Sequence, residues 1–235
     1  MDAERLFFRI NGLFCFAVAI DFLWNAGLLL RSSARIDPQA AGNLDQFLQS
    51  YLRDLAGGAP YLLSLVHYLP AMMMISLMLA FYLYLHRRSR PLSLLALIFG
   101  LVLSGMLIVR QFSAGQLAQL AVRFIGEPDP TSRVAVFKEA STLYGLYLAH
   151  GLLVNRASMV AYAFIGWLFR KSYSFYEVIV GTAFLASSGV LFFHEISRRL
   201  LGSAGDSATF AIPAIAFALA GVVLLRVRGR GESED

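Results

Sequence analysis

Long apolar runs dominate the pattern of hydrophobic and polar positions along this chain. Each run is close to the length of about 20 residues that a helix needs to cross the hydrocarbon core of a bilayer. The sequence therefore predicts an all-α fold, a polytopic membrane bundle of six transmembrane helices that forms a single domain. The predicted spans cover residues 7–30, 61–85, 91–109, 143–169, 175–194 and 208–225.

The polar segment between the first two spans carries a second pattern, which predicts an amphipathic helix over residues 38–56. Asp37 supplies an acceptor at the N-cap, and Pro38 suits the first helical position. An interfacial helix bound to anionic lipid is usually rich in Lys and Arg, whereas this one contains only Arg53. A lid across the outer mouth of the bundle is therefore favoured over a helix lying on the membrane. Its apolar residues, at i, i+3 and i+4 spacing, are Leu44, Phe47, Leu48, Tyr51, Leu52 and Leu55.

The segment between the third and fourth spans shows similar features. Residues 117–125 carry a short apolar stripe that is expected to extend the third span. Asp129-Pro130 again combines an N-cap acceptor with a first-turn proline. The following helix is therefore expected to begin near Thr131, well before it enters the membrane. After the last span, the polar tail 229–235 is expected to be disordered.

Composition and charge agree with insertion into a membrane. Apolar residues make up 58% of the chain and charged residues 15%, whereas soluble domains have about 45–50% and about 25%. The net charge of +5 does not indicate a nucleic-acid partner, because the basic residues are scattered between the apolar runs. The single cysteine, Cys15, cannot form an intrachain disulfide.

The basic residues also predict the orientation, because cytoplasmic loops of membrane proteins are enriched in Lys and Arg. Cations are densest in the termini and the two short connections, so both termini are predicted to be cytoplasmic, in the cell (inner) membrane. A cleavable signal peptide is the competing interpretation, and Asp21 and Asn25 inside the first run argue against it. The predicted cytoplasmic cations are Arg5, Arg9, Arg87, Arg88, Arg90, Arg170, Lys171, Arg226, Arg228 and Arg230.

Polar residues interrupt the apolar spans, and ionisable groups within a bilayer are functional candidates because they are costly to bury. By position along the spans, most of them fall in the outer half of the membrane, and only His86 and Glu177 lie near the inner side. The candidate ligand or cavity residues are Asp21, Asn25, His67, Arg110, His150, Asn155, Arg156, His194 and Glu195.

Three interpretations of this polar cluster remain open. In the first, Asp21 forms a buried ion pair with Arg156 or Arg110, and the cluster only fixes helix packing. In the second, the cluster lines a cavity for a small ligand or a transported solute. In the third, His67, His150 and His194 ligate haem b or zinc, although no HExxH motif or i, i+4 histidine pair supports this.

The sequence thus favours a non-enzymatic integral membrane protein, either an accessory subunit of a membrane complex or a component that binds or transports a small ligand. The alternative is a histidine-ligated haem electron carrier or a metal-dependent intramembrane hydrolase. The expected partners are the lipid bilayer and either other membrane subunits or further copies in a homo-oligomer.

Three stretches carry a resemblance to a known family: Arg9–Leu13, Leu83–Ala96 and Gly166–Ser172. They resemble a broad group of uncharacterised bacterial multi-helix membrane proteins, catalogued as domain of unknown function 4386. The resemblance implies a bacterial, multi-pass topology. It supplies no site residues, because that group has no established activity.

Overall fold

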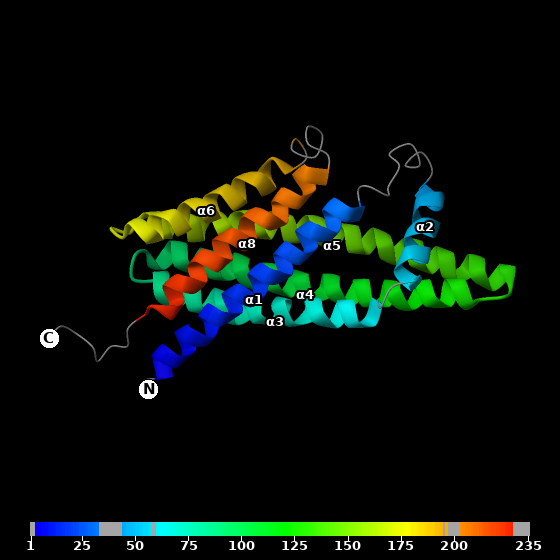
Figure 1. The fold of residues 1–235 in the computed structure, drawn as a ribbon, viewed down its shortest axis with the longest axis horizontal. Coiled ribbons are helices and arrows are strands. Elements are labelled where there is room, and N and C mark those ends of the chain that lie inside the picture. Colours follow the sequence, from blue (N-terminus) through cyan, green and yellow to red (C-terminus); the bar gives the residue numbers. More distant parts are fainter. Residues whose placement is uncertain (1–2, 33–43, 58–59, 195, 197–202, 228–235) are drawn as a thin grey trace.

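The structure is a computed structural model that describes residues 3–32, 44–57, 60–194, 196 and 203–227, with some side chains inside these ranges left undescribed. The described part contains helices and no strands, which confirms the predicted all-α class (Figure 1). The helices are α1 (Ala3–Ser32), α2 (Leu44–Gly57), α3 (Pro60–Leu85), α4 (Arg90–Gly126), α5 (Pro130–Arg170), α6 (Phe175–Phe192) and α8 (Ser203–Leu225). The predicted disordered tail 229–235 lies outside the described residues.

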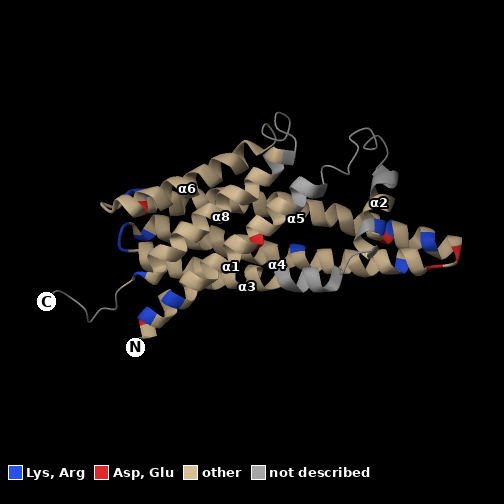
Figure 2. Cartoon of the chain, viewed as in Figure 1, with Lys and Arg blue, Asp and Glu red and all other residues tan. Residues whose placement is uncertain are grey.

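Six of these helices, all except α2, are long and apolar enough to cross a membrane, as the sequence predicts. The start of α1, the α3–α4 turn, the α5–α6 turn and the end of α8 meet at one end of the bundle (Figure 1). Lys and Arg residues gather there (Figure 2), so this end, formed by residues 3–9, 84–90, 167–177 and 226–227, is called the basic end. The chain is therefore a multi-pass membrane protein whose excess of positive charge lies at one end.

A cluster of aromatic rings is buried inside the bundle. Phe81, Phe169, Phe184 and Phe217 are buried, and Tyr162 joins them from α5. Their ring centroids are 5.4 to 6.3 Å apart, mostly in edge-to-face or tilted arrangements. Such pairs stabilise by about 0.5–1.5 kcal/mol beyond area burial. The aromatic cluster therefore packs α3, α5, α6 and α8 together.

Two glycine pairs bring helices into backbone contact. A Cβ atom on Gly181 of α6 would lie 2.6 Å from the carbonyl oxygen of Gly166 on α5, and the reverse distance is 2.7 Å. Gly12 and Gly221 form a similar contact between α1 and α8, at 3.0 and 2.9 Å. Because lipid tails are as apolar as side chains, close backbone packing is a main source of helix association in membranes.

α4 and α5 form a hairpin much longer than a membrane span. They contain 37 and 41 residues, which gives lengths of about 55 and about 60 Å against a hydrocarbon core of about 30 Å. The expectations that the third span continues and that the next helix starts near Thr131 are confirmed. α5 begins at Pro130, and Asp129 Oδ2 accepts a hydrogen bond of 2.8 Å from the Ser132 amide. This bond lowers the pKa of the exposed Asp129 carboxyl.

α2 packs on the hairpin, away from the other helices (Figure 1). Its stripe residues Leu48 and Leu52 are buried in a second hydrophobic core with Leu117, Ala121 and Ala140 of α4 and α5. The apolar stripe of the expected lid is therefore covered by the hairpin. The helix begins at Leu44, and residues 38–43 of its predicted range lie outside the described part. Residues 44–57, 113–126 and 130–147 are called the hairpin module.

Truncation of Leu52 tests the hairpin module as a separate core. Leu52→Ala is expected to lower the free energy of unfolding by about 2 kcal/mol, because Leu52 is fully buried and the cavity left by its side chain closes only in part. The loss should increase hydrogen exchange of amides in α2 and the outer halves of α4 and α5, while amides around Phe81 keep their protection. Val122→Ala, at an exposed position of α4, is the control. An equal increase throughout the bundle would contradict a separate module.

Candidate functional site

The predicted outer polar residues are only partly brought together. Asn25 Nδ2 donates to the carbonyl oxygen of Asp21, 2.8 Å away on the same helix. Arg156 is exposed on α5, and α1 packs mainly against α8 and α3. An ion pair between Arg156 and the half-buried Asp21 therefore stays a prediction, and the neighbouring Asn155 is half-buried on α5.

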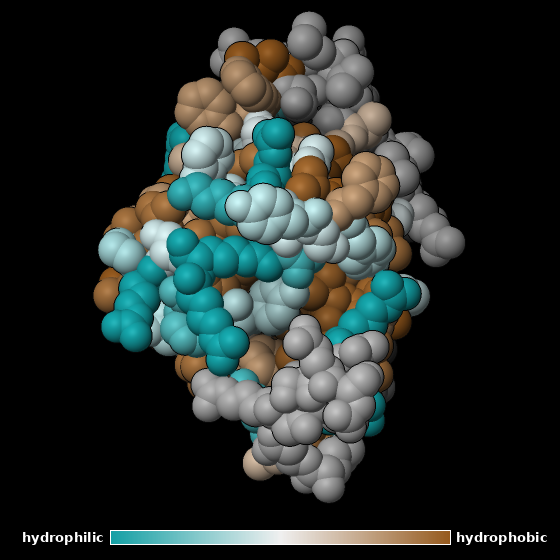
Figure 3. Space-filling model, turned by 90° about the vertical axis from the view of Figure 1, so that its left-hand side faces the viewer, coloured by the Kyte–Doolittle hydropathy of each residue, from teal (hydrophilic) through white to brown (hydrophobic). Residues whose placement is uncertain are grey.

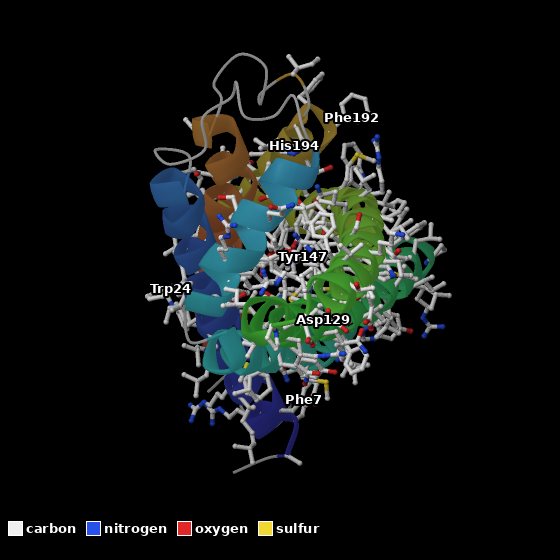
Figure 4. The ribbon with its side chains drawn as sticks, turned by 90° about the vertical axis from the view of Figure 1, so that its right-hand side faces the viewer. Phe7, Trp24, Asp129, Tyr147, Phe192 and His194 are labelled. Atoms are coloured by element: carbon white, nitrogen blue, oxygen red, sulfur yellow. The ribbon has the colours of Figure 1, made fainter. Side chains whose placement is uncertain are left out.

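Arg110 has found a different partner, on α5. Its Nη2 donates to the Tyr147 hydroxyl at 3.1 Å, and the guanidinium carbon lies 4.8 Å from the centre of the Tyr147 ring. The Tyr144 ring stacks beside Tyr147, and the Tyr51 ring of α2 lies 5.3 Å from that of Tyr144. This cation–aromatic cluster ties α2 to the hairpin where it leaves the bundle, and Figure 4 places Tyr147 between these elements.

Burial in this cluster raises the pKa of the Tyr51 hydroxyl, with the neighbouring tyrosines adding to the rise and Arg110 opposing it. Tyr51 therefore stays neutral at physiological pH and serves as a packing group. Sequence reasoning identified Arg110 but missed its aromatic partners. The available signal was that Tyr144 and Tyr147 are three residues apart, on one face of a helix.

In the outer region, Arg110 Nε and His150 Nδ1 are buried polar atoms that lack a hydrogen-bond partner among the described residues. Buried polar atoms normally have a partner, which is often an ordered water. Arg110 Nε and His150 Nδ1 are therefore candidates for a hydrogen bond to an ordered water or to a small polar ligand.

The histidine hypothesis falls partly outside the described residues. The side chain of His67 and the whole of Glu195 are not described, whereas His194 is half-buried near the end of α6 (Figure 4). Among the side chains that are described, no three His, Cys, Asp or Glu residues are close enough to hold a metal ion. Ligation of haem b or zinc by His67, His150 and His194 therefore stays a prediction.

The most complete polar network lies at the basic end and was not predicted. Arg88, in the α3–α4 turn, forms an ion pair with Glu177 in the first turn of α6, and the Tyr84 hydroxyl donates to the same carboxylate. Arg88 Nη1 also donates to the Leu168 carbonyl oxygen at 3.0 Å, near the end of α5. The guanidinium lies over the rings of Tyr84 and Phe169, at 5.5 and 5.8 Å.

This network connects four helix ends. The side chains of Arg88 and Glu177 are 21% and 12% exposed, so both charges are largely shielded from water. Arg88 uses its donors on a carboxylate and on a carbonyl that has no partner within its own helix. The arrangement is better explained as a structural link between α3, α5 and α6 than as a reactive centre, because each polar group already interacts with another.

Two open hollows lie on the hairpin module. One, of about 450 Å³, lies beside Gln116, Gln119 and Glu139. The other, of about 630 Å³, is called the module groove and is lined by Gln49, Arg53, Phe124, Ile125, Pro130, Arg133, Val134 and Phe137. A third hollow, inside the bundle beside Phe81 and Ile165, has no room for a water molecule.

Comparisons with family models, curated proteins and solved structures give no match to this chain. The resemblance to domain of unknown function 4386 therefore stays a prediction.

Proposed function

We propose that this protein is a non-enzymatic accessory subunit of a membrane complex and that its hairpin module binds a partner subunit outside the bilayer. In this proposal the protein lies in the bacterial inner membrane with both termini cytoplasmic, so the module projects from the outer face. The observation that carries the proposal is the length of α4 and α5, which exceeds a span and supports a separate core with α2.

The surface of the module supports partner binding. Ile125 and Val134 are 51% and 54% exposed in the module groove, on the part of the hairpin that extends past the bundle. Lipid can cover exposed apolar residues on a transmembrane helix, but water surrounds the module, and apolar patches exposed to water often mark interaction sites. Arg53 and Arg133 also line the groove, and no acidic side chain that the structure describes does. A partner with apolar side chains flanked by carboxylates fits this surface.

A second candidate function is the binding of a small polar ligand near the outer membrane surface. The unpartnered Arg110 Nε and His150 Nδ1 favour it. Neither of the two hollows on the hairpin module is lined by Arg110 or His150, and for that reason the partner-binding function is preferred.

The proposal is tested by site-specific photo-crosslinking in the cells that make the protein. A photoreactive residue at Val134 is expected to give one discrete crosslinked product, whereas the same residue at Val102, exposed on the membrane part of α4, crosslinks to lipid. Ile125→Asp with Val134→Asp should dissociate the complex on native gels while the thermal stability of the protein is kept. Val122→Asp with Ala135→Asp adds the same two charges at exposed positions outside the groove lining and is the control. A wild-type protein that migrates alone, with no product from Val134, would refute the proposal.

A further inference from the structure

The basic end has a strong excess of positive charge. Its described acids are Glu4 and Glu177, and Glu177 is already paired with Arg88. Figure 3, which looks onto this end, shows hydrophilic side chains gathered over its surface. Its exposed cations are Arg9, Arg87, Arg90, Arg170, Lys171 and Arg226. By contrast, residues 123–139 at the tip of the hairpin carry Arg123, Arg133 and Lys138 against Glu127, Asp129 and Glu139, with no net charge.

Within the basic end, the α5–α6 turn combines cations with exposed aromatic rings. Trp167 is 53% exposed, Phe175 is 81% exposed and Tyr173 is fully exposed. The Lys171 ammonium lies 5.9 Å from the centre of the Trp167 ring. The turn is ordered by backbone hydrogen bonds from Lys171 to Trp167 and from Ser172 to Phe169, at 3.3 and 3.1 Å.

We propose that this turn binds the headgroup of an anionic phospholipid, with Arg170 and Lys171 contacting the phosphate and the three rings lying at the headgroup level. Aromatic rings concentrate at this depth of a membrane, where one side of the ring meets acyl chains and the other meets water. Basic residues next to the membrane are attracted by anionic lipid. Trp167 lies on the last turn of α5, and Phe175 is the first residue of α6. Both are therefore at the end of an apolar span.

The neighbouring charges leave the two cations available. Glu177 is the acidic residue nearest in sequence to the turn, and its carboxylate is engaged by Arg88 and Tyr84. Arg170 and Lys171 are both exposed. The site does not depend on the proposed partner-binding function, since it lies at the opposite end of the molecule from the hairpin module (Figure 1).

Fluorescence quenching provides the test, because the chain contains only two tryptophans and one of them lies in the site. In a Trp24→Phe background, Trp167 is the single reporter. The protein is placed in phosphatidylcholine vesicles with an equal mole fraction of either brominated phosphatidylglycerol or brominated phosphatidylcholine. Brominated phosphatidylglycerol is expected to quench Trp167 more strongly, because it is enriched beside the turn.

Arg170→Gln with Lys171→Gln should lower the relative association constant for the anionic lipid about 25-fold, because each of the two removed cations contributes a factor of about five near an anionic surface. Arg133→Gln with Lys138→Gln, at the hairpin tip, should leave the quenching ratio unchanged. Free glycerol phosphate at constant ionic strength should also leave it unchanged. Equal quenching by the two lipids, or loss of the preference in free glycerol phosphate, would overturn the proposal.

Discussion

Gly181→Ala is expected to lower the free energy of unfolding by about 3 kcal/mol, near the upper end of the range for overpacking a tight site. The new methyl group would lie 2.6 Å from the Gly166 carbonyl oxygen and 2.7 Å from the Arg170 amide nitrogen. Both neighbours are backbone atoms, which cannot move aside unless α5 and α6 separate. The change is best measured by reversible unfolding of the protein in mixed micelles.

Gly189→Ala provides a control on the same helix. No atom lies within 4 Å of a Cβ at this position, and alanine has a helix propensity about 1 kcal/mol better than glycine. Gly189→Ala should therefore leave stability unchanged or raise it slightly. If Gly181→Ala is as harmless as Gly189→Ala, the two helices do not cross at Gly166 and Gly181.

Glu177→Gln is expected to have the second large effect, also about 3 kcal/mol, because it leaves the shielded Arg88 charge without its counter-charge. The value lies at the low end of the range for buried pairs, since the Arg88 side chain is 21% exposed. Amide oxygens can still accept from Tyr84, so the loss reports mainly on the charge. Thermal unfolding in detergent should show the loss as a clear decrease in melting temperature.

A double-mutant cycle isolates the pair. Arg88→Gln removes both the charge and the hydrogen bond to Leu168, so it should also destabilise the protein. The two losses are expected to fall short of additivity by about 1–3 kcal/mol, as for residues in direct contact. Arg87→Gln, at the exposed neighbouring position, should show no coupling with Glu177→Gln. Additive losses for Arg88 and Glu177 would contradict the ion pair.

Local patterns were sufficient to predict the helices. Each span is a predominantly apolar run, and the cost of leaving backbone groups unpaired in lipid forces such a run into a helix. The extension of α4 and the start of α5 also followed from local signals, the stripe over residues 117–125 and the Asp129-Pro130 cap. These features depend on residues close in sequence, so no knowledge of the tertiary fold was needed.

The contacts between distant residues could not be predicted in the same way. The stripe of α2 indicates which face is buried, but it does not indicate whether lipid, the bundle mouth or the hairpin covers that face. Arg88 and Glu177 are 89 positions apart, and each is an ordinary residue for a helix end. Likewise, nothing in the sequence distinguishes Gly166 and Gly181, which are in backbone contact, from Gly145 and Gly189, which have open space around them.

Cysteine labelling in intact cells tests the central claim, that the hairpin module projects out of the bilayer on the side opposite the basic end. The natural Cys15 is buried and should remain unlabelled by a membrane-impermeant maleimide. Ala135→Cys, exposed on the hairpin module outside the groove, is expected to react from outside the cell, and Tyr173→Cys only after permeabilisation. Val102→Cys, exposed on the membrane part of α4, should react in neither condition. Failure of Ala135→Cys to react in intact cells, or reaction of Tyr173→Cys in intact cells, would contradict the account.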